Sequence, residues 1–148
     1  MKSSGDIEFL IKQYFSEREI LKVIEHKKRK LEENIKEFLS QGIDKNETKD
    51  INEKIQKLLN EKKRIILNSN LDMEYAINML NTEEKKILIY IYKLKKSENW
   101  IAKKLMYSRT TVHNKKTRIL EKINVSMEEF EKRKRNIEAW HIDVEKNL

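Results

Sequence analysis

The sequence predicts an all-α fold, and two properties of its 148 residues support this prediction. It contains two glycines and no proline, so little in it interrupts a helix. Charged residues make up 39% and hydrophobic residues 38%, a balance that favours long, exposed helices over one thick core. We expect a long antiparallel hairpin resembling a coiled coil, a helix-turn-helix unit, and a C-terminal amphipathic helix.

The hairpin is expected over residues 1–68. Apolar residues recur at three- and four-residue steps from residue 6 to residue 39, although charged residues interrupt the heptad register. Gly42 can end this helix in a polar turn, and a second apolar stripe follows over residues 48–67. The two stripes most simply cover one another. Such a hairpin serves either as a spacing device or as a surface for oligomerisation or partner docking.

A helix-turn-helix unit is expected over residues 71–125. It opens with a short helix, Asp72 to Leu80, and a second helix that Asn81 or Thr82 caps. Glu83 and Glu84 stand favourably in the first turn of that second helix. Its apolar face has helical spacing and consists of Ile87, Leu88, Ile91 and Leu94.

The motif itself begins at Ser97, which can cap a helix over residues 98–105. Met106 and Tyr107 form the turn, and Ser108 caps the next helix. That next helix carries Val112, Ile119 and Ile123 on one side. Its opposite side presents polar side chains: Arg109, Thr110, Thr111, His113, Asn114, Thr117 and Arg118. A short helix, a tight turn and a polar second helix match the geometry that reads a major groove.

The charge distribution supports contact with nucleic acid. Residues 82–123 contain twelve basic and four acidic residues, so this segment alone carries the chain's net charge of +8. Arginine can bond two acceptors on guanine, and asparagine can pair with adenine. Threonine can contact base edges through its hydroxyl or its methyl group. Eight residues are expected to contact phosphate: Lys103, Lys104, Ser108, Thr111, Lys115, Lys116, Thr117 and Arg118.

The segment from Leu80 to Ile123 resembles region four of sigma factors, which reads a promoter element and contacts RNA polymerase. The run from Trp100 to Ser108 is closer still to small phage transcriptional regulators of the ArpU and RinA kind, which also place a helical front half before such a motif. The motif-level resemblance covers less than a third of the chain. It implies that four residues face bases: Arg109, Thr110, His113 and Asn114.

Two features depart from that family pattern. Met106 stands where glycine, asparagine or aspartate commonly takes a left-handed turn. Lys115 and Lys116 stand where sigma factors usually place an apolar residue. Both features concern the geometry of the motif and leave its polarity pattern intact.

The last predicted element is an amphipathic helix over residues 126–148. Ser126 and Glu129 form the S-x-x-E pattern of a capping box. Phe130, Ile137 and Val144 then recur every seven residues, with Trp140 beside them and a basic run over residues 132–135.

The sequence offers no sign of an enzyme, a metal site or a cofactor. It has no cysteine, and His26, His113 and His141 lie too far apart for a local metal motif. Two glycines cannot build a phosphate-binding loop. The longest apolar run, Ile87 to Tyr92, is far below the ~18 residues that span a membrane. We therefore expect a cytoplasmic protein without a membrane partner.

The expected function is sequence-specific transcription regulation. We expect the protein to activate a phage or mobile-element operon. The expected partners are double-stranded DNA, RNA polymerase, and a second copy bound through the hairpin or the C-terminal helix. Three alternatives stay open: a sigma-like adaptor that binds RNA polymerase, a phage small terminase subunit, and a purely structural coiled-coil protein.

Overall fold

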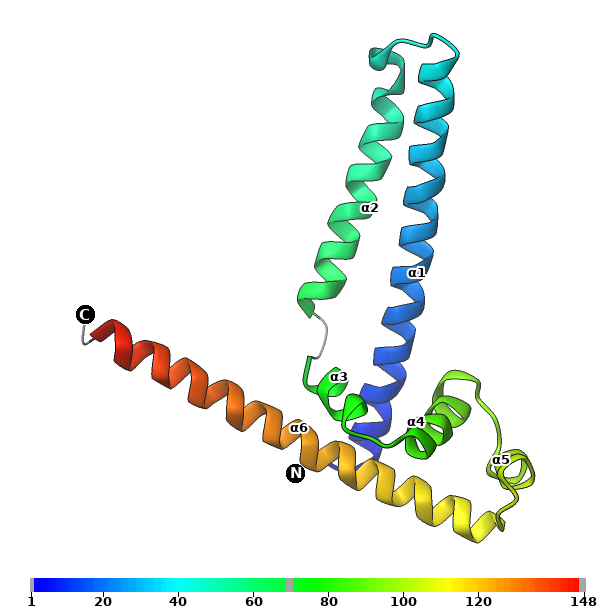
Figure 1. Cartoon of the computed structure of the whole chain (residues 1–148), viewed down its shortest axis with the longest axis vertical. Coiled ribbons are helices and arrows are strands. Elements are labelled where there is room, and N and C mark those ends of the chain that lie inside the picture. The colour runs from blue at the N-terminus through cyan, green and yellow to red at the C-terminus, as the bar shows by residue number, and fades with distance from the viewer. Residues whose placement is uncertain (1, 69–70, 147–148) are drawn as a thin grey trace. The chain divides into compact units, whose positions relative to one another are not determined.

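The computed structural model describes residues 2–68 and 71–146, and for residues 68 and 138–146 it describes the backbone alone. This part of the chain is helical and contains no strand, which confirms the all-α prediction. Six α-helices, α1 to α6, follow one another with short connections (Figure 1).

The chain divides into two compact units, and each has its own core. The hairpin unit is Ser16–Ser69, and the motif unit combines Met1–Phe15 with Asn70–Leu148. The predicted boundary, which gave all of residues 1–68 to the hairpin, is therefore wrong for the first fifteen residues. The physical reason is that Ile7 and Ile11, one turn apart, are buried in the motif unit's core.

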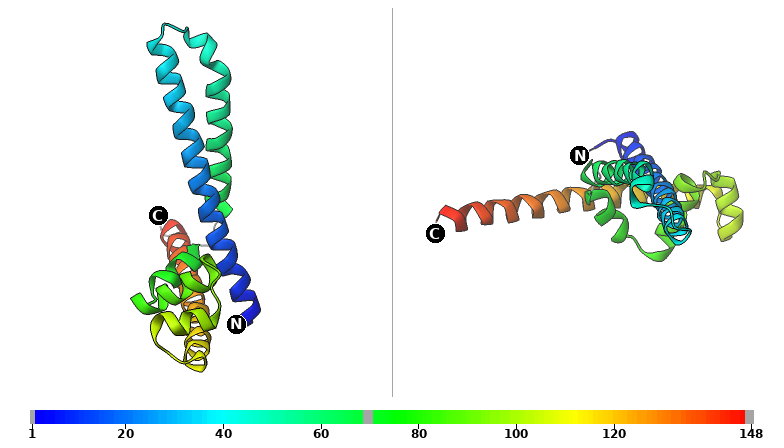
Figure 2. Two further views of the ribbon diagram at one scale, coloured as in Figure 1. Left: turned by 90° about the vertical axis from the view of Figure 1, so that its right-hand side faces the viewer. Right: turned by 90° about the horizontal axis from the view of Figure 1, so that it is seen from above.

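In the hairpin unit, α1 (Ser4–Ser40) from Ser16 onward and α2 (Lys49–Asn68) run side by side (Figures 1 and 2). Gly42 ends α1 as predicted, with a φ of 84°. The amide of Ile43 donates to the carbonyl of Phe38 at 3.0 Å, and the amide of Gly42 donates to Leu39 at 3.2 Å. These bonds form a Schellman motif, in which glycine adopts the left-handed conformation without steric cost. A short 3-10 turn, Lys45–Thr48, leads into α2.

The hairpin unit has a thin core. Ile24 of α1 and Ile65 of α2 are buried, whereas most of the two apolar stripes remain partly exposed. Lys62 of α2 donates to Glu25 of α1, and this bond, followed by nearby positive charges, lowers the pKa of Glu25. Two helices cannot enclose an apolar stripe completely, so one side of this unit stays open.

The motif unit is built from the start of α1 and the four remaining helices. These are α3 (Leu71–Asn78), α4 (Thr82–Leu88), α5 (Glu98–Leu105) and α6 (Arg109–Lys146), with a π-helical turn, Ile89–Lys93, directly after α4. Asn81 caps α4 as predicted. Its side chain accepts from the Glu84 amide at 2.8 Å, and the Glu84 carboxylate accepts from the Asn81 amide at 3.0 Å.

The core of the motif unit brings together residues from four helices and the π-helical turn. Its fully or nearly fully buried members are Ile7, Ile11, Met73, Ala76, Leu80, Ile87, Leu88, Tyr92, Ile119, Leu120, Ile123 and Met127. Ile87, Leu88, Ile119 and Ile123 were expected on apolar faces, because their helical spacing is visible in the sequence. Leu94, also expected on such a face, is 50% exposed, because the π-helical turn ends the helix at Lys93.

The predicted boundary before a separate C-terminal helix is wrong, because α6 continues from Arg109 to Lys146 without interruption. Ser126 lies inside the helix. The apolar series Ile119, Ile123 and Met127 continues across the predicted boundary, and α3 packs against it. The ring of Phe130 lies 5.4 Å from that of Tyr75 on α3, which extends the same contact. The side chains of Trp140 and Val144 lie outside the described residues.

Candidate nucleic-acid interface

The packing of α5 against α6 positions the candidate interface. Ile101 and Ala102 of α5 and Val112 of α6 form a small buried cluster. Ser97 caps α5 by accepting from the Trp100 amide at 3.1 Å. Ser108 caps α6 by accepting from the Thr111 amide, also at 3.1 Å. Both predicted caps are confirmed, and they fix where each helix begins.

The turn between α5 and α6 has the left-handed conformation that its position requires. Met106 has φ 62° and ψ 40°, and its amide donates to the Ala102 carbonyl. The following amide, that of Tyr107, donates to the same carbonyl at 2.9 Å. The turn therefore closes as a glycine-containing one does, with a methionine side chain that is 90% exposed.

A cluster of three side chains ties this turn to the rest of the motif unit. The Tyr107 hydroxyl donates to the Glu83 carboxylate at 2.8 Å, and Lys115 of α6 lies 2.8 Å from the same carboxylate. The Lys115 ammonium also sits 4.9 Å from the centre of the Tyr107 ring. Hydrogen bonds from Lys115 and then from Tyr107 lower the pKa of Glu83. The cluster thus stabilises the fold above the carboxylate's ordinary pKa and loses that contribution as the pH falls.

The four predicted base-contacting residues lie together on the exposed side of α6. Arg109, Thr110, His113 and Asn114 are all exposed on the first turns of the helix, whereas Val112 between them is buried. This is the arrangement expected of side chains that enter a groove. The contact of these four residues with bases stays a prediction.

Glu98, which no local sequence pattern identifies, lies within contact distance of two of these four residues. Glu98 is the first residue of α5, and its carboxylate lies 3.1 Å from Nδ1 of His113 and 3.8 Å from Nε of Arg109. It is 15 and 11 positions before these partners, so no local spacing rule identifies it. Its only sequence signal is an acidic residue at a helix N-terminus.

The five basic residues among the predicted phosphate-contacting residues fall into two groups. Lys103, Lys104 and Arg118 are exposed and form no ion pair in the described part of the chain. Lys115 and Lys116 are instead partly buried and paired: Lys115 with Glu83, and Lys116 with Glu8 of α1 at 3.4 Å and with Glu98 at 4.0 Å.

The three hydroxyl residues among these candidates form hydrogen bonds within α6 or between α6 and its cap, Ser108. Ser108 and Thr111 share a 2.8 Å contact between their hydroxyls, and Thr117 donates to the His113 carbonyl at 3.1 Å. The candidates with side chains unengaged in the described chain are therefore the two α5 lysines and Arg118.

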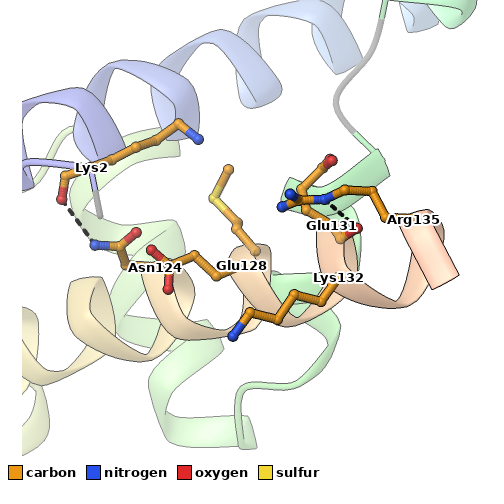
Figure 3. A pocket seen from close by; sticks show the side chains of 7 residues that line it. Lys2, Asn124, Glu128, Glu131, Lys132 and Arg135 are labelled. Carbon is orange, nitrogen blue, oxygen red and sulfur yellow. Dashed lines mark hydrogen bonds between the residues drawn. The ribbon is translucent and has the colours of Figure 1, made fainter.

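Elsewhere in the motif unit, a hollow of about 510 Å³ lies between Lys2 and α6 (Figure 3). Asn124 donates to the Lys2 carbonyl at 2.9 Å, and Arg135 donates to the Glu131 carbonyl at 3.4 Å. Because its lining mixes acidic and basic side chains, this hollow favours no ligand of one charge. Among the described residues, no group of three or more histidine or acidic side chains could hold a metal ion.

No described helix combines the length and hydrophobicity that crossing a membrane would require. No protein-family model, no curated protein and no solved structure matches the chain.

Proposed function

We propose that this protein is a sequence-specific DNA-binding transcription regulator that reads the major groove with residues 109–123 of α6. One observation carries the proposal. Arg109, Thr110, His113 and Asn114 form an exposed polar surface on the first turns of a helix whose other side is anchored by α5. The resemblance to phage regulators supports a role in activating a phage or mobile-element operon.

In this proposal base edges are read by α6 and phosphates are bound largely by α5. The Arg109 guanidinium can bond two acceptors of guanine, and the Asn114 amide can pair with adenine. Lys103 and Lys104, at the end of α5, add attraction that does not depend on sequence and that falls as salt rises. The pairing of Lys115 and Lys116 within the protein favours a structural role for both.

Glu98 is a positioning residue in this mechanism. Its carboxylate holds Arg109 and His113 at the start of α6 before DNA arrives, which limits the side-chain freedom lost on binding. Glu98 is negatively charged, as the phosphates of DNA are. Arg109 and His113 therefore have to release part of their contact with Glu98 when α6 occupies the groove.

The test is selection of bound sequences from a randomised duplex library with the full chain, with and without RNA polymerase. We expect one enriched motif in both conditions. Arg109→Ala and Asn114→Ala should each reduce the ratio of specific to non-specific affinity by roughly 5- to 150-fold, from about 1–3 kcal/mol per base contact. Matched controls are Arg29→Ala and Asn52→Ala, which change exposed residues of the hairpin unit.

Each alternative gives a different result in the same experiment. Enrichment that needs RNA polymerase indicates a sigma-like adaptor, and ring-shaped assemblies in solution indicate a terminase subunit. A structural coiled-coil protein binds no DNA at any salt concentration. Equal effects of the Arg109 and Arg29 substitutions would contradict base reading by α6.

A further inference from the structure

The hairpin unit contains a groove that its own helices do not fill. Leu31 of α1 and Leu58 of α2 are partly exposed and line a hollow of about 480 Å³. Four lysines line the same hollow, two from each helix: Lys27, Lys30, Lys54 and Lys57. The spacing of three and four residues places each helix's contribution on one face.

The positive charge of these four lysines is not neutralised within the described part of the hairpin unit. They are exposed and form no ion pair or hydrogen bond in the described part of the chain. Some other cations of the unit are paired, for example Lys28 with Glu32 at 3.7 Å and Arg64 with Glu61 at 2.5 Å. The lining of the hollow, in contrast, contains four lysines and no acidic residue. Like charges that line one hollow repel one another, and salt screens that repulsion only beyond a Debye length of about 10 Å. An oppositely charged partner would remove that repulsion.

We propose that this groove binds one amphipathic helix of a partner protein, with an apolar stripe flanked by aspartate and glutamate. Apolar side chains of that helix would cover Leu31 and Leu58, and its acidic flanks would pair with the four lysines. This is the helix-in-groove mode of recognition, with charge complementarity setting the choice of partner. Because the residues belong to the hairpin unit, the inference is independent of the proposed reading of DNA by α6.

Charge and hydrophobicity together favour this occupant over two others. A second copy docked through the same groove would bring two sets of four lysines face to face. A nucleic acid would satisfy the lysines, but its phosphate backbone would leave the two leucines uncovered. An acidic amphipathic helix satisfies both features at once.

The direct test uses a synthetic helical peptide of about 20 residues, long enough to be marginally helical alone. Leucines at helical spacing form its apolar stripe, and glutamates flank them. Its affinity for the full chain is measured by fluorescence anisotropy, and we expect binding that weakens as salt rises. Two control peptides replace every glutamate with lysine or place the same leucines at a two-residue period. Both should bind at least tenfold more weakly.

A charge-swapped variant localises the binding. Reversing all four groove lysines, K27E with K30E, K54E and K57E, should reduce affinity for the acidic peptide at least tenfold and create affinity for the lysine peptide. The matched control reverses four exposed lysines outside the groove, K36E with K45E, K49E and K63E, and should retain preference for the acidic peptide. Circular dichroism checks folding, and the milder pair K27E with K57E should give a smaller loss in the same direction.

Several results would overturn the proposal. One is equal binding of the acidic and lysine peptides, and another is equal binding of the period-two control. A dimer in sedimentation that the groove variant alone abolishes would identify a second copy as the occupant. A loss of duplex DNA affinity confined to the groove variant, without acidic-peptide binding, would identify nucleic acid. None of these results depends on whether α6 reads a specific sequence.

Discussion

Met106 holds a conformation that favours glycine, with a φ of 62° and 90% of its side chain exposed. The left-handed region costs a residue with a side chain about 1–2 kcal/mol. Met106→Gly removes that strain but adds chain entropy to the unfolded state. We therefore expect a net rise of about 0.5–1 kcal/mol in the free energy of unfolding, measured by urea denaturation.

The control for this prediction is Met79→Gly. Met79 follows α3, is 58% exposed and has no positive φ, so glycine there offers no relief of strain and should lower stability. Stabilisation by both substitutions, or by neither, would contradict the left-handed turn as the source of the gain.

Lys115 and Lys116 stand at positions where the expected family pattern has an apolar residue, and the structure shows how the two lysines are accommodated there. A lysine can cover apolar surface with its methylene chain while its ammonium group finds a partner. Here Glu83 and Tyr107 surround the Lys115 ammonium, and Glu8 of α1 lies beside that of Lys116. Glu8 lies outside the motif in sequence, so the compensation could not be found by inspecting the motif alone.

At the scale of helices, the beginnings and ends that depend on local chemistry could be predicted. The caps Asn81, Ser97 and Ser108 and the helix end at Gly42 each need only a few neighbouring residues to form their hydrogen bonds. The same local reasoning failed at Ser126, because packing of α6 against α3 makes an uninterrupted helix more favourable. Glu129, assigned to the capping box, accepts a bond from Arg133 at 2.6 Å instead.

Serine-to-alanine substitutions distinguish a capping serine from an internal one. Ser97→Ala should lower the free energy of unfolding by about 1 kcal/mol, because the Trp100 amide loses its acceptor. Ser126→Ala should be neutral or stabilising by up to about 0.5 kcal/mol, since alanine is the better residue inside a helix. Urea denaturation of both variants gives the comparison. A loss of about 1 kcal/mol at Ser126 would mean that a helix begins there after all.

At the scale of the whole molecule, helical periodicity identifies an apolar face but not what the face packs against. The stripe of α1 extends from Ile7 to Phe38 with only isolated charged interruptions, so the sequence predicted a single hairpin partner for all of it. The structure divides this stripe between two cores. The sequence pattern could not predict this division, because the residues of later helices that surround Ile7 and Ile11 lie more than sixty positions further along the chain.

This division predicts that the first turns of α1 stabilise the motif unit rather than the hairpin unit. Ile11 is fully buried in the motif unit, so Ile11→Ala should cost about 2–5 kcal/mol there. Hydrogen exchange should accelerate at amides of α3, α4 and the first half of α6, while those of α2 keep their protection. Ile20→Ala is the matched control, because Ile20 is 45% exposed in the hairpin unit and its loss should change stability by less than about 0.5 kcal/mol. Because α6 carries the proposed reading surface, the DNA affinity of the Ile11→Ala variant should fall under conditions in which its motif unit is partly unfolded. Acceleration in α2 alone would instead assign the start of α1 to the hairpin.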